Sequence, residues 1–303
     1  MQGATSGIRW KTVRRCVIGI CLSIGCLSPS LASVDICQQP TAYSQLSIAY
    51  YKDEKSTFES GTGEIGQENT NFDLLLHSKK NWAFGVGHRY TILNVDGLQL
   101  QTNGHLHTFF LSLHKQSQSD HGSFRFSVAP ALSASSNVMK DPGEYSADAF
   151  QLLAALVWRN TLSDRVTLRY GACGDHRFGR YEIYPLISFD WQPHADWTIE
   201  LGFPTTRVAY QVSKNITSSL RIAPEGNEWH VKDKNLEKQS QLVYEASLLE
   251  WTINWQAHEH FRISASVGRK FHNRYEMTLL DDSRVSLSSD SVTRIGAALA
   301  WRF

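Results

Sequence analysis

Apolar and polar side chains alternate every second residue along most of this 303-residue chain. The last twelve residues show the pattern clearly, because Ile295, Leu299 and Trp301 fall on one face of an extended chain while the opposite face holds small residues and arginine. Side chains of a β-strand point to its two faces in turn, so a period of two predicts a strand with one apolar face. No segment of note shows a helical period, and an all-β fold is therefore predicted.

The connections between the predicted strands alternate between short and long. Short periplasmic turns on one side and longer outer loops on the other are the layout of a transmembrane antiparallel up-and-down β-barrel. We count about fourteen strands, or twelve if Pro204 lies inside one bent strand. The connections Cys173–Phe178 and Phe203–Thr205 are too short to fit the alternation. The short turns lie near Ser78, Gln118, Ser163, Pro193, Asn215 and His258, and the longer connections are Lys55–Gly66, Asn94–Asn103, Ser135–Ser146, Lys232–Gln239 and His272–Ser291.

The first 32 residues have the organisation of a secretory signal peptide. A cationic region, Arg9–Arg15, precedes a short apolar run, Cys16–Leu27, and cleavage is predicted between Ala32 and Ser33. A lipoprotein site at Cys26 is the alternative. The predicted organisation is therefore a signal peptide at residues 1–32, a periplasmic leader at 33–40 and an outer-membrane β-barrel at 41–303, exported through the inner membrane.

Cleavage of the signal peptide changes both the charge and the cysteine content. It removes four cations, which leaves 26 Lys and Arg against 29 Asp and Glu, and no basic excess points to nucleic acid. Two cysteines remain, Cys37 in the leader and Cys173 at the far end of a middle strand. A disulfide requires Cα atoms within about 7 Å. We predict no disulfide because the two cysteines are expected on opposite sides of the membrane, and the remaining spacing supports no metal site.

Charged residues in the phase opposite to the apolar residues are predicted to line the barrel lumen. A charged side chain that faces lipid near the membrane midplane destabilises a barrel by roughly 2–4 kcal/mol. The strand face that carries these charges is therefore expected to be the hydrated one. All the bases among them are arginines, whereas lysine is concentrated in turns and loops. Such rows either line a water-filled pore or pair across the lumen and close it. The predicted lumen charges are Asp73, Arg89, Arg125, Arg169, Glu182, Asp190, Glu200, Arg207, Arg221, Glu245, Glu250, Arg262, Arg294 and Arg302.

Two stretches break the regular pattern. The apolar residues of Leu242–Leu248 occupy even positions and those of Trp251–Trp255 occupy odd positions, which predicts a β-bulge near Leu249 or Glu250. Pro185 falls in the middle of a predicted strand, where a closed barrel needs the missing N–H. A bulge or an early strand end would accommodate it.

Aromatic residues gather at the predicted periplasmic end and at the C-terminus. Indoles with an apolar body and a polar tip suit a membrane interface, although the edge of a soluble sandwich core would also hold them. The tryptophans concerned are Trp82, Trp158, Trp191, Trp197, Trp255 and Trp301.

The chain ends on Trp301, Arg302 and Phe303. This ending resembles the closing strand of bacterial outer-membrane proteins, which implies that Trp301 and Phe303 are an assembly signal for the barrel-assembly machinery. The segments from Ile183 to Pro204 and from Ala223 to Trp229 resemble a family of uncharacterised, porin-like bacterial outer-membrane β-barrels. That resemblance implies a barrel surrounded by outer-membrane lipid, and it implies no activity.

The sequence favours a passive channel or transport barrel of unknown substrate. Two alternatives stay open, a barrel enzyme acting on lipid or peptide and a secreted soluble β-sandwich that binds a ligand. A hydrolase would need a nucleophile, a base and an orienting group, and no such motif is recognisable. We therefore predict no enzyme, cofactor or metal, and we make no prediction of oligomeric state. The side chains considered for chemistry are Ser112, His77, His88, His105, His107 and His114.

Overall fold

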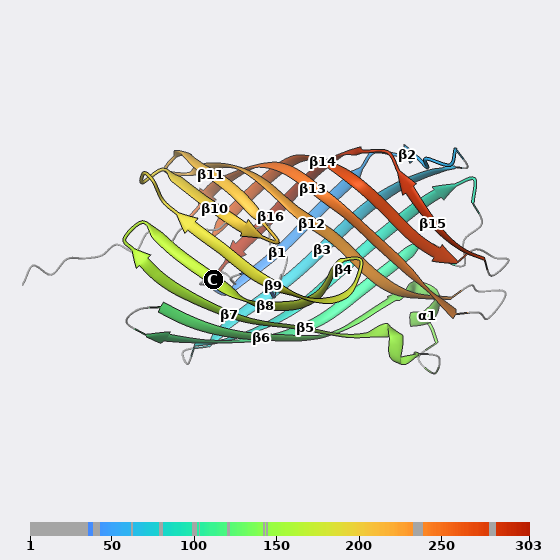
Figure 1. The fold of residues 1–303 in the computed structure, drawn as a ribbon, viewed down its shortest axis with the longest axis horizontal. Coiled ribbons are helices and arrows are strands. Elements are labelled where there is room, and N and C mark those ends of the chain that lie inside the picture. Colours follow the sequence, from blue (N-terminus) through green and yellow to red (C-terminus); the bar gives the residue numbers. More distant parts are fainter. Residues whose placement is uncertain are drawn as a thin grey trace, which may run out of the picture.

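The computed structural model describes residues 36–38, 43–61, 63–78, 81–98, 102, 104–119, 122–141, 143, 145–232, 239–278 and 283–303. They form a closed β-barrel, seen from the side in Figure 1. Sixteen strands make one sheet, and the ring closes because β1 pairs with both β16 and β3. Since β2 and β15 lie off this ring, fourteen of the described strands close the barrel, which confirms the predicted fold class and count. The soluble β-sandwich is excluded.

The strands of the sheet are long and are joined in sequence order. Their bounds are β1 Gln45–Asp53, β2 Ser56–Thr57, β3 Glu64–Ser78, β4 Trp82–Asp96, β5 His105–Ser119, β6 Gly122–Ser135, β7 Phe150–Ser163, β8 Val166–Phe178, β9 Arg180–Trp191, β10 Trp197–Phe203, β11 Thr206–Ser213, β12 Ile216–Lys232, β13 Gln239–His258, β14 Phe261–Thr278, β15 Arg284–Ser289 and β16 Val292–Arg302. A short helix, α1 Ser136–Met139, and a 3-10 turn, η2 Ala147–Ala149, follow β6. Among the described residues, no helix is long and apolar enough to cross a membrane.

The two ends of the barrel differ. The short turns and the C-terminus lie at the end that we call periplasmic, and β2, β15 and α1 lie at the opposite, outer end (Figure 1). The predicted long loop His272–Ser291 is wrong, because β14 continues to Thr278 and pairs with β15 from Asn273↔Ser289 to Thr278↔Arg284. Beyond Lys270 the inward side of β14 shifts from even to odd positions, and Tyr275 and Met277 are buried in an apolar core at the outer end, which explains why the strand continues.

Two outer connections are very short, although the predicted connection Cys173–Phe178 is wrong because these residues belong to β8. Gly179 alone separates β8 from β9, and it adopts a left-handed φ of 89° that favours glycine. Pro204 and Thr205 separate β10 from β11, with a cis peptide bond at Phe203–Pro204. Pro204 therefore lies in a turn between two strands, which settles the count at fourteen rather than twelve.

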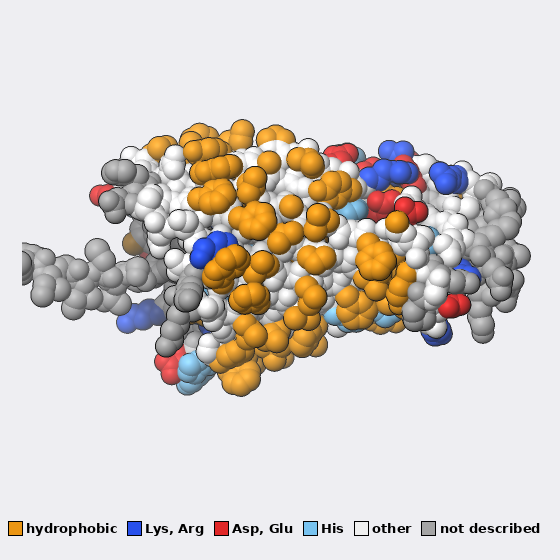
Figure 2. Space-filling view, turned by 90° about the horizontal axis from the view of Figure 1, so that it is seen from below, with side chains coloured by type: hydrophobic (Ala, Val, Ile, Leu, Met, Phe, Trp, Pro, Cys, Tyr) orange, Lys and Arg blue, Asp and Glu red, His pale blue; other side chains and the backbone are white. Residues whose placement is uncertain are grey.

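The outward face of the barrel is apolar. Figure 2 shows hydrophobic side chains spread over most of its length, with the largest group of charged side chains toward the right-hand end and a few more at the other end. This distribution matches the apolar band of a membrane barrel, and the tryptophans near the periplasmic end extend it. Prominent members of the band are Ile48, Phe72, Phe84, Leu111, Leu152, Ile183, Ile187, Leu220, Trp251, Ile253, Leu299 and Trp301, which are all exposed.

Strand β13 keeps one phase along its length. Leu242, Tyr244 and Leu248 are buried inside the barrel, as are the later even positions Glu250 and Asn254. The predicted bulge near Leu249 or Glu250 is therefore wrong. The irregularities in the β13–β14 pairing lie between Glu245 and Ser247 and between Gln256 and His258 instead. The apolar residues at the outer end of β13 belong to a core within the lumen, which a rule of apolar side chains outside could not anticipate.

Two strand prolines, Pro185 and Pro224, lie where the wall of the barrel lacks a neighbouring strand. β9 pairs with β10 only from Ile187 to Trp191, so Pro185 lies on an edge with no β10 partner. β12 pairs with β11 only up to Ile222, and Pro224 follows on its unpaired edge. Proline is tolerated at such edges because no ladder N–H is required there. This explains how Pro185 is accommodated, and it marks a notch between β9 and β12 above the short β10–β11 hairpin.

Beyond the notch, β12 crosses to β6. His230 forms a parallel bridge with Ala134, and the side chains of Ser133 and Gln151 both donate hydrogen bonds to the Glu228 carbonyl, each at 2.8 Å. These bonds satisfy the Glu228 carbonyl of β12, which has no β11 partner because β11 is too short to extend this far. Toward the outer end, the lumen is consequently narrower than a fourteen-strand ring would make it.

Candidate functional site

The inward faces of the strands enclose a cavity of about 220 Å³, which we call the chamber. Its lining combines amide and guanidinium donors with aromatic rings and carboxylates. Binding sites for small polar molecules typically have such a lining, in which a few polar groups point into the cavity between aromatic rings. The amides include Gln67, Asn69, Asn71, Gln151 and Asn227, the arginines Arg89, Arg221 and Arg294, and the rings Tyr51, Phe110, Trp229 and Tyr244.

Three buried charges, Asp53, Lys270 and Arg294, form an ion network in the chamber wall with the partly buried Glu225. Lys270 Nζ lies 2.6 Å from Asp53 Oδ2 and 2.8 Å from Glu225 Oε1. Arg294 donates from Nε to Asp53 Oδ1 at 2.7 Å and from Nη2 to Glu225 Oε1 at 2.8 Å. Two cations therefore share two carboxylates, and the network joins β1, β12, β14 and β16. Buried charges are tolerated when they are paired in this way.

Three members of the network were absent from the predicted lumen charges. Asp53, Glu225 and Lys270 lie beyond the predicted ends of their strands, yet each continues the inward alternation. The two-residue period could have identified two of them. Glu225 shares the inward face of β12 with the predicted Arg221, and Lys270 shares the inward face of β14 with the predicted Arg262. Lys270 is 1% exposed inside the barrel, so it is an exception to the concentration of lysine in turns and loops.

Two further ion clusters join predicted lumen residues. Arg221 Nη2 donates to Glu250 Oε2 at 3.0 Å, across the β12–β13 pair. Arg169 Nη2 donates to Asp190 Oδ1 at 2.8 Å and also to Glu200 Oε1, which links β8, β9 and β10. These contacts pair charges between neighbouring strands of the wall.

An apolar core closes the lumen at the outer side of the chamber, and we call it the roof. Its buried residues come from opposite walls of the barrel, so they meet in the middle. Trp229 and Tyr244 belong both to the roof and to the chamber lining. The roof consists of Phe58, Ile65, Leu93, Leu106, Trp229, Val231, Leu242, Tyr244, Ala246, Tyr275 and Met277.

The described leader residues, Ile36–Gln38, lie inside the lumen, and we call them the floor. Ile36 and Cys37 are each 2% exposed and pack against inward residues of β6, β7, β8 and β9. Arg125 clamps them, because its guanidinium donates to the carbonyls of Ile36, Cys37 and Gln38. Ile36 and Gln38 also line the chamber. The expectation of a leader outside the barrel is therefore wrong for these residues, while residues 1–35, with Cys26 and the Ala32–Ser33 site, lie outside the described part.

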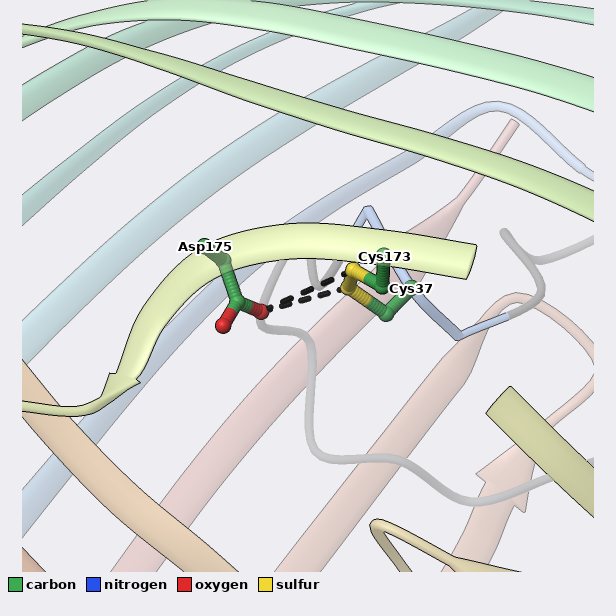
Figure 3. A group of neighbouring side chains, drawn as sticks. All are labelled: Cys37, Cys173 and Asp175. Carbon is green, nitrogen blue, oxygen red and sulfur yellow. Dashed lines mark hydrogen bonds between the residues drawn. A yellow bond between two sulfur atoms is a disulfide. The ribbon is translucent and has the colours of Figure 1, made fainter. Parts of the chain in front are cut away.

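A disulfide joins Cys37 of the floor to Cys173 of β8, with Cα atoms 5.8 Å apart (Figure 3). The prediction of no disulfide is wrong, because the leader folds back into the barrel and does not stay at the periplasmic side. Asp175 lies beside the sulfurs and accepts hydrogen bonds from Tyr184 Oη and Arg177 Nε, both at 2.9 Å. Thiolates, and not disulfide sulfurs, are the usual sulfur ligands of metals, so in this state the group is a covalent tether.

The remaining predicted lumen charges divide into two sets. Asp73, Arg207 and Arg262 are buried inside the barrel, Arg89 lines the chamber beneath the Phe110 ring, and Arg302 lies over the Tyr43 ring. Glu182 keeps the inward phase of β9 and is exposed at its outer end. The prediction for Glu245 is wrong, because Glu245 lies in the outward phase of β13 and is 3.6 Å from Arg274. The apolar even positions of β13 face the core inside the lumen and not lipid at this end, so the opposite phase points outward.

The histidine candidates form two separate groups. His114 is buried between Ser127 Oγ at 2.8 Å and Ser112 Oγ at 3.1 Å. Among the residues described, no carboxylate contacts His114, so the orienting group of a hydrolase is missing there. His88 and His107 stack on the outward face, with 3.1 Å between Nε2 and Nδ1, and this face is outside the chamber.

Comparisons with solved structures find outer-membrane barrels. The NanC porin is 6% identical with a TM-score of 0.43, and the match covers 85% of this chain and 100% of that chain. An outer membrane channel from Pseudomonas putida F1 is 8% identical with a TM-score of 0.45, covering 90% and 99%. A Pseudomonas aeruginosa FadL homologue is 11% identical with a TM-score of 0.46, covering 86% and 90%.

Sequence comparisons place the chain in a family without assigning it a function. No curated protein matches this sequence. A family model matches residues 40–283, which is most of the chain and nearly all of the barrel. The chain therefore belongs to the family described as Domain of unknown function (DUF6268).

Proposed function

We propose that this protein is an outer-membrane transport barrel that holds a small polar solute in the chamber between two closures. The observation that carries the proposal is the position of the chamber, a polar cavity inside a lipid-exposed barrel with an apolar roof and a tethered floor. An open pore would need no such enclosed site. The lining offers hydrogen-bond donors, acceptors and ring faces to one small molecule.

The location of the protein belongs to the same proposal. The apolar band and the aromatic residues near the periplasmic end support residence in the outer membrane. Export behind a signal peptide cleaved between Ala32 and Ser33, and recognition of Trp301 and Phe303 by the barrel-assembly machinery, complete it. No catalytic step is included, because the described partners of His114 are two serines.

The roof and the floor act in series in this proposal. The floor is held by one covalent bond and by three hydrogen bonds from Arg125, so its release requires both to be removed. The roof depends on large apolar side chains, of which Trp229 is 3% exposed and touches the chamber. Opening either closure alone leaves the other in the path of a solute.

Conductance in planar lipid bilayers tests this arrangement. The floor variant Cys37→Ser/Arg125→Gln and the roof variant Trp229→Ala are each expected to pass a current close to that of the wild type. Combining the three substitutions should raise the current several-fold, because both closures are then weakened. The matched control is Trp251→Ala in place of Trp229→Ala, since this indole is 46% exposed on the outward face of the barrel.

Folding of each variant is checked by its gel shift without boiling, and Leu242→Ala provides a second way of thinning the roof. A folded triple variant that conducts no more than its parents contradicts the proposal. High current through the folded wild-type barrel also contradicts it, because two closures in series could not then be present.

A further inference from the structure

Three lumen-facing arginines near the periplasmic end differ from the other lumen arginines. Arg169, Arg221 and Arg294 each pair with a carboxylate, and Arg125 donates to backbone carbonyls. For Arg207 on β11, Arg262 on β14 and Arg302 on β16, no carboxylate partner is found within the described part of the chain. The set Arg207, Arg262 and Arg302 is called the arginine trio below.

Strand pairing places two members of the trio beside each other. Arg262 lies opposite Ala300 in the β14–β16 ladder, and Arg302 follows two residues later on the same inward face. Such diagonal neighbours lie about 7–8 Å apart, within reach of long side chains. Arg207 faces the same lumen from β11, where it lies opposite Arg221 in the β11–β12 ladder.

Burial makes this cluster unusual. Arg262 is 5% exposed and Arg207 is 9% exposed. The buried Nε atoms of Arg207 and Arg302, together with Nη2 of Arg302, have no hydrogen-bond acceptor among the described residues. A buried guanidinium without an acceptor is unfavourable, and a second cation beside it adds repulsion. An anion bound among the three would remove both unfavourable effects.

The neighbouring carboxylates do not replace such an anion. Glu200 lies opposite Arg207 in the β10–β11 ladder, and Asp190 lies opposite Glu200. Both carboxylates accept hydrogen bonds from Arg169, which lies between them. Arg302 stacks on the Tyr43 ring at 5.1 Å, and this contact supplies no carboxylate.

We propose that the arginine trio is a binding site for a small oxyanion, a carboxylate or a phosphate group, in the periplasmic half of the lumen. Guanidinium forks match the geometry of both groups, which explains why arginine serves here and lysine does not. The idea that the oxyanion belongs to the transported solute rests on the proposed function, whereas the binding itself does not.

Anion binding is tested by the thermal unfolding midpoint of the purified full-length barrel in detergent. Sodium phosphate and sodium acetate are compared with sodium chloride at equal ionic strength. At least one oxyanion is expected to raise the midpoint of the wild type, because a ligand that binds the folded state stabilises it. In Arg262→Gln the Kd for that anion should rise by about 10-fold or more, since charged hydrogen bonds contribute about 1.5–3 kcal/mol.

Two further variants separate binding from general stability. Arg262→Lys keeps the charge but loses the fork, so it should bind more weakly than the wild type and more tightly than Arg262→Gln. Arg180→Gln removes an arginine whose side chain is 57% exposed at the outer end, and it should bind as the wild type does. Absence of an oxyanion effect on the wild type, or an equal effect in Arg262→Gln, overturns the proposal.

The failure of this site and the failure of the transport proposal have different signatures. The conducting triple variant should prefer anions in reversal-potential measurements, and adding Arg262→Gln should reduce that preference. Current without an oxyanion effect on unfolding would overturn the site and leave the transport proposal standing. An oxyanion effect that Arg262→Gln abolishes, in a barrel that never conducts, would establish the site and overturn transport.

Discussion

Replacing Lys270 by methionine tests whether the ion network stabilises the barrel. The ammonium of Lys270 is buried between Asp53 and Glu225, at 2.6 and 2.8 Å. Its removal leaves those two carboxylates to share Arg294, and one buried negative charge is then uncompensated. Removing one member of a buried pair typically costs about 3–5 kcal/mol, a large part of the roughly 5–15 kcal/mol that keeps a protein folded.

The measurement is chemical unfolding in lipid vesicles, followed by tryptophan fluorescence. The matched control is Arg180→Gln, which breaks an ion pair with Glu276 of 2.6 Å at an exposed position. Exposed pairs contribute about 0–1 kcal/mol, so the control should unfold almost as the wild type does. The double variant Lys270→Met/Glu225→Gln restores charge balance with Asp53 and Arg294, and it should regain part of the loss. Equal unfolding free energies for Lys270→Met and Arg180→Gln would refute the reasoning.

Two other substitutions probe the two apolar surfaces of the barrel. Leu299 lies between Ile48 and Ile263 on the outward face of β16, and Leu299→Arg should lower the free energy of unfolding in vesicles by about 2–4 kcal/mol; no loss would show that this face does not meet lipid. Phe58 is 1% exposed in the roof and packs edge-to-face on Tyr275. Phe58→Ala should cost about 3–5 kcal/mol in the same assay, and a loss below 1 kcal/mol would show that the roof is loosely packed.

The sequence predicts the barrel well because a two-residue period leaves little freedom. Once the turns are placed, each strand must put one face in lipid, and Ile253 and Leu299 follow this rule. The same rule fails where the lumen is itself apolar. Leu242 and Tyr244 face inward, because side chains from opposite walls meet there and exclude water. Hydrophobicity alone cannot tell lipid from a core.

The candidate site is less predictable because it depends on contacts between distant segments. The alternation places Arg294 in the lumen, but it does not identify the partners of Arg294. Asp53 is its partner because of the register between β1 and β16, and Glu225 is its partner because of the path of β12 across the barrel. The position of the floor inside the lumen is harder still to predict from the sequence. Nothing in the composition of residues 33–40 indicates that Cys37 enters the barrel and reaches Cys173.

The tether between Cys37 and Cys173 constrains the order of events in biogenesis. In the finished barrel these cysteines are 2% and 1% exposed, so a protein oxidant has no route to them. We therefore expect oxidation to precede insertion, while the two cysteines, 136 positions apart in the sequence, still belong to an open chain. The precursor would reach the membrane as a covalent lariat, and non-reducing electrophoresis of chains trapped before insertion would reveal the ring.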